Sequence, residues 1–298
     1  MTTDIPKWRY WIAACRPKTL TVAFVAVLAG TALAFSVGEI NWFIAFLALI
    51  CSLLMQAGAN LINDAADFKT GADTEERLGF PRATQMGWLS YEEVYYGGLA
   101  AFALAFVLAI PLVVHGGLFI LFLLVVSIMA GYGYSAGPYP LAYHGLGEVF
   151  VLIFFGYVCT TIPYYLQTGA VDLKILLAST QIGVISTLLI AINNTRDIEG
   201  DKKAGKKTLA ARYGIVFGKL EISLTLLLPF LLNLLWAKLG YPIAAFLPLS
   251  LLPLATIIIQ GIWKHSPGRL YNGYFVLSAL LHLVFGILLS LAFILQDL

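Results

Sequence analysis

The chain has 298 residues, of which 60% are apolar and 11% are charged, and its mean hydropathy is +0.87. A soluble domain carries about 25% charged residues, so this composition excludes an ordinary soluble enzyme, a disordered chain and a nucleic-acid binder. The net charge is only +2, which predicts no polyanionic partner. The sequence therefore predicts an all-α integral membrane protein surrounded by a lipid bilayer.

Apolar runs of about 20 residues predict the membrane spans, because a helix of that length crosses a bilayer with its backbone hydrogen bonds made internally. The third and fourth runs are separated only by His115, Gly116 and Gly117, which predicts a tight hairpin. Basic residues precede the first run as in a signal peptide, but this run is longer than a signal core, and we expect a retained helix. We expect nine spans, over residues 20–37, 42–62, 95–114, 118–134, 148–165, 175–192, 220–236, 244–263 and 275–295.

The distribution of Lys and Arg predicts the orientation. With nine spans the termini lie on opposite sides, and a cytoplasmic N-terminus places 16 of the 18 cations on the cytoplasmic side, leaving only Lys174 and Lys238 outside. The sequence therefore predicts a bundle of nine transmembrane helices with the N-terminus cytoplasmic and the C-terminus outside. We expect one domain over residues 1–298, as a multi-pass protein of the cytoplasmic (inner) membrane.

Two cytoplasmic segments are too long and too polar to be simple connections. Residues 63–93 and 193–219 together hold ten of the sixteen acidic residues, beside several cations. One interpretation is that these loops only keep the cytoplasmic side hydrated. The other, which the matching pattern below favours, is that they form the cap of an active site.

The two polar loops begin with similar motifs. In the first, spacings of three and four residues place four polar side chains on one helical face, namely Asn60, Asn63, Asp64 and Asp67. In the second, the same spacing groups Asn193, Asp197 and Asp201. Each motif therefore stacks carboxylates at the cytoplasmic end of a membrane helix.

Stacked carboxylates repel one another unless a cation lies between them. Mg²⁺ fits, because it prefers oxygen ligands and is usually held by one or two carboxylates together with substrate phosphates. We expect two Mg²⁺ ions bridged by a diphosphate. Asp73 can instead pair with Lys69 or Arg77. The expected metal ligands are Asp64, Asp67, Asp73, Asp197 and Asp201.

Other polar side chains are expected to bind or orient the substrate. Asn60, Asn63 and Asn193 either orient the carboxylates or only form hydrogen bonds between helices. Arg82 and Lys206 are expected to neutralise the diphosphate, with Arg77 and Lys207 as further candidates. Lys202 and Lys203 follow Asp201 directly and fit ordinary positive-inside charge, and we expect the same topological role for Arg16 and Lys18.

Aromatic faces exclude water and stabilise a positive charge by cation–π attraction. Tyr134, Tyr139 and Tyr143 are candidates, although tyrosines near a membrane interface also serve as anchors. His144 is a candidate base, or a residue that binds a substrate carboxylate, whereas Glu148 is expected only to favour a helix N-terminus. Spans rich in Phe, Leu and small residues are expected to let an apolar substrate tail run into lipid.

The two motifs carry a family resemblance. Asn63-Asp64-Ala-Ala-Asp67 followed by Gly71 and Asp73, and Arg196-Asp197-x3-Asp201, resemble the UbiA superfamily of intramembrane aromatic prenyltransferases. This resemblance implies a helical bundle whose two Asp-rich motifs bind Mg²⁺ and the diphosphate of a polyprenyl donor. It also implies transfer of the prenyl chain to an aromatic acceptor.

Finer features resemble one branch, the 1,4-dihydroxy-2-naphthoate polyprenyltransferases of menaquinone synthesis. This resemblance implies a polyprenyl diphosphate and an aromatic acid as substrates, and loss of the ring carboxylate as CO₂ to give demethylmenaquinone. The superfamily often has a further Asp where this chain has Gly71, and a Lys where Tyr139-Pro140 here leads to Tyr143 and His144. The segments are NDAADFKTGADT, GFPRATQMG, YSAGPYPLAYHGLGE and NNTRDIEGDKKAGKKTLAARYG.

Two alternatives remain open at this point. The chain can be a related enzyme that prenylates 4-hydroxybenzoate or homogentisate. It can also be a cation-coupled membrane transporter, although transporter sites tend to lie near the bilayer midplane. The acidic motifs here follow the predicted spans at their cytoplasmic ends, which favours the enzyme.

Overall fold

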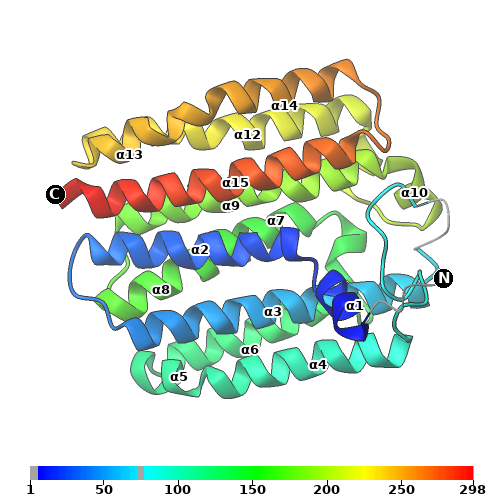
Figure 1. Ribbon diagram of the computed structural model, residues 1–298, viewed down its shortest axis with the longest axis horizontal. Helices are drawn as coiled ribbons and strands as arrows, with labels where there is room; N and C mark the ends of the chain where they lie inside the picture. The colour runs from blue at the N-terminus through cyan, green and yellow to red at the C-terminus, as the bar shows by residue number, and fades with distance from the viewer. Residues whose placement is uncertain (1–5, 73–76, 298) are drawn as a thin grey trace.

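The computed structural model describes residues 6–72 and 77–297, and within these ranges the regular structure is helical, with no strand. The long helices lie side by side, with α1 and α10 at one end of the bundle and the C-terminus at the other (Figure 1). In chain order the first elements are α1 (Lys7–Ala14), α2 (Pro17–Phe35), α3 (Trp42–Lys69), α4 (Tyr91–Leu108), α5 (Ile110–Gly116), α6 (Leu118–Gly133), η1 (Leu141–His144), α7 (Gly147–Val151), η2 (Leu152–Val158) and α8 (Cys159–Thr168). The remainder are α9 (Leu173–Arg196), α10 (Ile198–Lys203), α11 (Leu209–Tyr213), α12 (Ile215–Lys238), α13 (Pro242–Phe246), η3 (Leu247–Leu251), α14 (Leu252–Lys264), α15 (Tyr271–Ile294) and η4 (Leu295–Asp297).

Seven helical segments in the described ranges are long and apolar enough to cross a membrane. An eighth is obtained if α4 and α5, which meet at a 40° bend, count as one span, while α6 has only 16 residues. The predicted hairpin lies between α5 and α6, where Gly117 has a φ of +79°. The seven segments are Pro17–Phe35, Trp42–Lys69, Gly147–Thr168, Leu173–Arg196, Ile215–Lys238, Pro242–Lys264 and Tyr271–Ile294.

Local sequence explains where the helices that carry the polar motifs begin and end. α3 starts at a side-chain cap from Asn41, continues through the first motif and ends only at Lys69. α4 starts at a capping box, in which Ser90 and Glu93 each accept a hydrogen bond from the other's backbone N–H. The first polar connection is therefore residues 70–90, shorter than the predicted 63–93.

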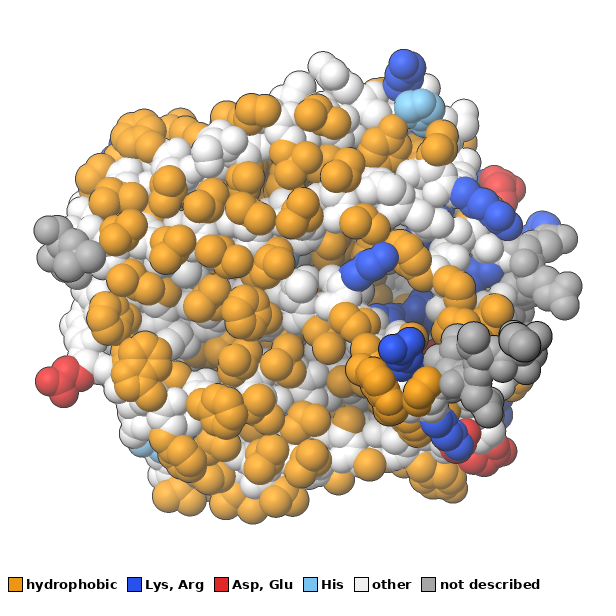
Figure 2. All heavy atoms as spheres, in the orientation of Figure 1, with side chains coloured by type: hydrophobic (Ala, Val, Ile, Leu, Met, Phe, Trp, Pro, Cys, Tyr) orange, Lys and Arg blue, Asp and Glu red, His pale blue; other side chains and the backbone are white. Residues whose placement is uncertain are grey.

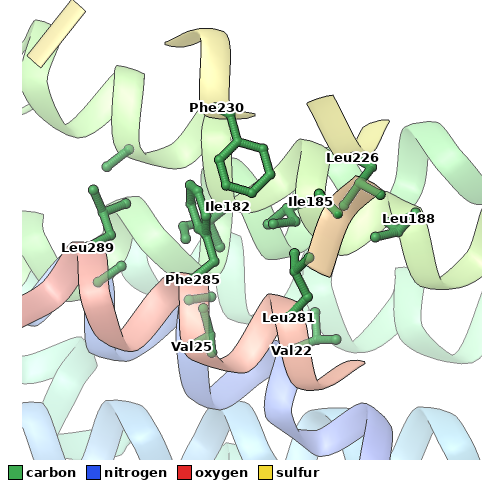
Figure 3. Packing of buried hydrophobic residues seen from close by; sticks show 14 of the residues in the cluster. Val22, Val25, Ile182, Ile185, Leu188, Leu226, Phe230, Leu281, Phe285 and Leu289 are labelled. Atoms are coloured by element: carbon green, nitrogen blue, oxygen red, sulfur yellow. The ribbon is translucent and has the colours of Figure 1, made fainter. Parts of the chain in front are cut away.

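The largest core cluster joins α2, α9, α12 and α15 (Figure 3). The rings of Phe230 of α12 and Phe285 of α15 meet edge to face at 5.4 Å, and Ile182 of α9 packs in the same cluster (Figure 3). The helices approach closely at Gly286, where a Cβ atom would lie 2.2 Å from a methyl carbon of Val25. Because lipid removes the hydrophobic drive between helices, such close packing of small residues is what holds a membrane bundle together.

The surface is divided in the way a bilayer requires. Hydrophobic side chains cover the middle of the visible face, and Lys and Arg gather at the end that carries α1 and α10 (Figure 2). Large apolar side chains such as Val114, Leu118 and Leu231 are more than half exposed. Such exposure is costly in water but favourable in lipid. The bundle therefore presents an apolar belt and one strongly cationic end.

Candidate active site

A cavity of about 1050 Å³ opens at the cationic end of the bundle. Its walls come from the junction of α1 and α2, the end of α3, the loop that follows α3, α7 and the segment from α9 to α11. Blue Lys and Arg side chains surround the hollow in Figure 2. Eight of the predicted site residues line it, namely Asn63, Asp67, Arg82, Tyr134, Asn193, Asp197, Asp201 and Lys206.

Asp67 lies at the centre of the cavity's polar contacts. Its carboxylate accepts hydrogen bonds from Lys206 Nζ at 2.8 Å and from the Tyr143 hydroxyl at 3.2 Å. Burial alone would lower the pKa of Lys206, but the Asp67 carboxylate raises it above its ordinary value. Lys206 also lies 4.9 Å from the centre of the Tyr143 ring. Residues 139 positions apart in the sequence therefore form one charged pair, and Tyr143 contacts both without lining the cavity.

The second motif places its acids on the opposite wall. Asp197 follows directly after α9, and its carboxylate accepts a hydrogen bond from the Arg196 Nε at 2.8 Å. Arg196 is almost fully buried and also donates to Asn272 Oδ1 at 2.7 Å, while Asn272 donates to the Leu78 carbonyl at 2.8 Å. This chain of contacts fixes Asp197 relative to α15 and to the loop after α3.

Asp201 lies one turn further on, in α10. Burial raises the pKa of its carboxyl group to about 7, an effect that Lys206 opposes and the Asp197 carboxylate adds to. The Thr208 hydroxyl donates to Asp201 Oδ2 at 3.2 Å. A buried carboxyl group that is this difficult to ionise beside a second carboxylate marks a place where a bound cation would be stabilised.

Asp64 and Asn60 lie away from the cavity. The Asp64 carboxylate is 1% exposed and accepts hydrogen bonds from the backbone N–H of Ala83 at 3.0 Å and from the Thr84 hydroxyl. Asn60 donates to the Cys15 carbonyl at 2.9 Å and to the Thr19 hydroxyl at 3.0 Å. Asn60 therefore has the interhelical role that the sequence left open, and Asp64 holds the loop after α3 in place. Asp73, the fifth predicted ligand, lies outside the described residues.

Topology was the favoured role for Arg16, with an approach to the pocket as the alternative, and the structure places it in the cavity lining. Its guanidinium donates to Asn63 Oδ1 at 2.7 Å, and Asn63 in turn donates to Ser135 Oγ at 2.8 Å and Asp67 Oδ2 at 3.3 Å. Arg16 has a φ of 55°, the one non-glycine residue with positive φ in the described ranges. Such strained backbone gathers at functional sites. The sequence signal was Pro17, which excludes the α conformation at the residue before it.

Glu148 was expected only at a helix N-terminus. It does begin α7, but its side chain is 6% exposed, lines the cavity, and accepts a hydrogen bond from Asn194 Nδ2 at 2.6 Å. Neither residue belongs to an Asp motif, so spacing could not reveal their contact. A carboxyl group at the start of a predicted membrane span was the available signal.

Of the aromatic candidates, Tyr134 lines the cavity and the others do not. The Tyr134 ring packs at 4.8 Å against Phe150, which stacks at 4.4 Å on Phe154. Both phenylalanines line a second, apolar pocket of about 140 Å³ between α3, α5, α6 and η2. Tyr139 instead stacks on His144, whose Nδ1 contacts the Pro140 carbonyl, so His144 lies outside the cavity wall.

The acidic side chains of the cavity offer oxygen ligands for a metal ion. Within residues 6–72 and 77–297, no three His, Cys, Asp or Glu side chains gather closely enough to form a protein-only metal site. Mg²⁺ does not require one, because one or two carboxylates and substrate phosphates usually hold it. Asp67 on one wall and Asp197 and Asp201 on the other supply hard oxygen ligands, with cations beside them for phosphate. The residues present therefore fit Mg²⁺ bound together with a diphosphate.

Comparison with known proteins gives a consistent result. The chain is 36% identical over 226 residues to the 1,4-dihydroxy-2-naphthoate octaprenyltransferase of Haemophilus influenzae, covering 72% of each chain. Its fold matches a UbiA homologue from Aeropyrum pernix K1 with a TM-score of 0.69 at 17% identity, covering 93% of this chain and 98% of that one. A UbiA homologue from Archaeoglobus fulgidus bound to DMAPP and Mg²⁺ matches with a TM-score of 0.53 at 19% identity, covering 94% and 99%. The model of the UbiA prenyltransferase family matches residues 23–280, and the chain belongs to that family.

Proposed function

We propose that this protein transfers a polyprenyl chain from a polyprenyl diphosphate to 1,4-dihydroxy-2-naphthoate, giving CO₂, diphosphate and the reduced (quinol) form of demethylmenaquinone. The observation that carries the proposal is the cavity lined by Asp67, Asp197 and Asp201, in which Lys206 is paired with Asp67. Metal-binding oxygens and phosphate-binding cations meet there at one end of an apolar bundle. The naphthoate acceptor is supported by the relative from H. influenzae, which is an octaprenyltransferase for that compound.

The charged residues divide into two roles in this proposal. Asp67, Asp197 and Asp201 hold two Mg²⁺ ions, with Asn63 and Asn193 orienting them, and the bound metal supplies the positive charge that stabilises the departing diphosphate. Lys206, Arg82 and Arg16 bind the diphosphate oxygens directly. Asp64 acts through the loop it holds, which carries Arg82, and is a positioning residue.

The apolar part of the substrate has a matching path. Tyr134 joins the polar cavity to the pocket lined by Phe150 and Phe154. We place the start of the prenyl chain along these rings, because their faces stabilise positive charge at the allylic carbon and exclude water. Small residues of that pocket, such as Ala48 and Gly131, leave room for an isoprenoid.

The topology is proposed as nine spans in one domain. The bent pair α4 and α5 forms the third span and α6 the fourth, which leaves the N-terminus cytoplasmic and the C-terminus outside in the cytoplasmic membrane. The loops after α3 and α9 then cap the active site from the cytoplasm. A reporter fused after Leu298 that is active in the cytoplasm would contradict this orientation.

Assays of the purified protein in lipid nanodiscs test the function. With geranylgeranyl diphosphate and Mg²⁺ we expect prenylation of 1,4-dihydroxy-2-naphthoate with release of CO₂, and no turnover after chelation by EDTA. Parallel reactions with 4-hydroxybenzoate and homogentisate are the acceptor controls. Turnover of either control acceptor but not of dihydroxynaphthoate would contradict the acceptor, and full activity in EDTA would contradict the metal site.

A further inference from the structure

Glu148 is a buried carboxyl group that does not bind metal in the proposed function. It lies on α7, and its Oε1 accepts a hydrogen bond from the Asn194 amide of α9 at 2.6 Å. Its Oε2 is buried without a hydrogen-bond partner among the described residues. A buried acceptor without a donor is unfavourable, and more so when the group is charged. A side chain that lines a cavity in this state is placed to receive a donor from a ligand.

The wall around Glu148 is closely packed and partly aromatic. Gly147 precedes it, and a Cβ atom there would lie 2.7 Å from Ile190 and 3.3 Å from the Tyr134 hydroxyl. Gly147 therefore lets α7 pack against Tyr134 and Ile190, and all four residues line the cavity. The Tyr134 ring beside Glu148 is a surface on which an aromatic acceptor can pack.

Other acidic residues of the cavity are already paired with cations. Asp67 and Lys206 are already paired with each other, and Asp197 is paired with Arg196. His144, the base considered from the sequence, lies outside the cavity lining. Glu148 is thus the acidic side chain of the cavity that lies in neither Asp motif and carries an unpartnered oxygen.

We propose that Glu148 is a catalytic residue that accepts a hydrogen bond from a hydroxyl of the aromatic acceptor and takes its proton. This inference rests on the proposed prenyl transfer and specifies how the acceptor is activated. Asn194 positions the carboxylate through Oε1, so that Oε2 faces the substrate.

The step conserves protons and electrons. The O–H bond breaks, its proton goes to Glu148 Oε2, and its electron pair forms a C=O bond as the ring carbon that bears the carboxylate bonds to the allylic carbon. The bond from that carbon to the diphosphate oxygen breaks, and its electron pair leaves with the diphosphate. Loss of CO₂ leaves its bonding pair in the ring, which restores aromaticity, and the ring oxygen takes the proton back from Glu148.

Glu148→Gln tests the inference with little change in shape. The Gln oxygen can still accept the hydrogen bond from Asn194, but the amide nitrogen that replaces Oε2 cannot take a proton. We expect kcat for dihydroxynaphthoate to fall by about 100-fold or more, the usual contribution of general-base catalysis. The affinity for geranylgeranyl diphosphate with Mg²⁺, measured by titration calorimetry, should remain within about threefold of the wild type, because Glu148 acts on the acceptor and not on the diphosphate.

Glu221→Gln is the matched control. Glu221 of α12 is partly buried and its Oε2 also lacks a hydrogen-bond partner among the described residues, but it does not line the cavity. We expect this variant to turn over at the wild-type rate. An equal loss in both variants would assign the effect to removal of buried charge in this region and would overturn the inference.

Methyl ethers of the acceptor separate proton transfer from a structural role. On the mono-methyl ether that blocks the hydroxyl facing Glu148, the wild type should be slow, and Glu148→Gln should lose nothing further. If the variant retains full activity on the free acceptor, or loses as much again on both ethers, the inference is wrong. A wild type that binds geranylgeranyl diphosphate but never prenylates dihydroxynaphthoate overturns the proposed function, and this inference with it.

Discussion

The two Asp motifs have similar spacing but different surroundings. α3 continues without interruption through Asn63, Asp64 and Asp67 to Lys69, whereas α9 ends at Arg196 and Asp197 lies at the junction with α10. At about 100° per residue Asp64 is about 60° from Asp67 around α3, and its carboxylate contacts Ala83 and Thr84 and does not line the cavity. The break in the second motif turns its acids into the cavity. Spacing alone therefore does not assign equal roles to equally spaced acids.

The largest effect should come from the acid that faces the cavity in the first motif. We expect Asp67→Asn to lower kcat/KM by about 1000-fold, because metal-bound charge stabilisation contributes several kcal/mol and each 1.36 kcal/mol is tenfold in rate. Steady-state kinetics with geranylgeranyl diphosphate would measure this loss. Glu39→Gln, an exposed acid outside the cavity lining, is the control. A loss below about tenfold would remove Asp67 from the metal site.

Lys206→Gln should reveal what the lysine does when no metal is bound. It leaves the buried Asp67 carboxylate without its ion-pair partner, and breaking such a pair costs about 3–5 kcal/mol. We expect a lower unfolding temperature in EDTA and a partial recovery on adding Mg²⁺, because the ion takes over part of the lysine's role. Lys202→Gln removes an exposed lysine that pairs with Glu199 and is the control. Equal instability with and without Mg²⁺ would contradict metal binding beside Asp67.

Asp64→Asn should destabilise the loop after α3 and leave metal affinity unchanged. The NH₂ of the introduced amide is a donor and would face the Ala83 N–H or the Thr84 hydroxyl, which are also donors. An unsatisfied buried polar group costs about 1–3 kcal/mol of stability. Thermal unfolding together with a Mg²⁺ titration of activity separates the two effects. An increase in the Mg²⁺ concentration needed for half-maximal activity, comparable with that of Asp197→Asn, would make Asp64 a metal ligand after all.

The smallest effect is expected for Asn60. Removing its two hydrogen bonds to the junction of α1 and α2 by Asn60→Ala should cost about 0.6–1.7 kcal/mol of stability, as for other polar contacts between membrane helices. Turnover per folded protein should not change. A kcat reduced as much as in Asp67→Asn would place Asn60 in the reaction.

Much of the fold followed from local sequence. Apolar runs and their flanking glycines predicted the helices and the hairpin at Gly117, since a bilayer permits few other structures. The bend between α4 and α5 and the π-helical turn Leu152–Val158 were not predicted, because hydropathy depends on composition and not on backbone geometry. Helix length and hydropathy in the structure therefore give seven spans, or eight with the bent pair, against nine from the apolar runs of the sequence.

The lining of the candidate site was predicted in part. Carboxylate spacing indicated Asp67, Asp197 and Asp201, which line the cavity, because like charges on one face need a cation. Spacing could not indicate the contacts of Arg16 and Glu148 with Asn63 and Asn194, which depend on how separate helices pack. A single cation near a membrane span is also expected from topology, so only Pro17, which follows Arg16, distinguished that residue in the sequence.

The position of the metal ions tests the central claim most directly. A crystal structure with Mn²⁺ in place of Mg²⁺ and a non-hydrolysable geranylgeranyl thiodiphosphate would locate them by anomalous scattering. The account predicts anomalous peaks between Asp67 on one wall and Asp197 and Asp201 on the other, bridged by the diphosphate, with Asp64 still bonded to Ala83 and Thr84. Peaks beside Asp64, or a diphosphate bound without any ion between the two walls, would contradict it.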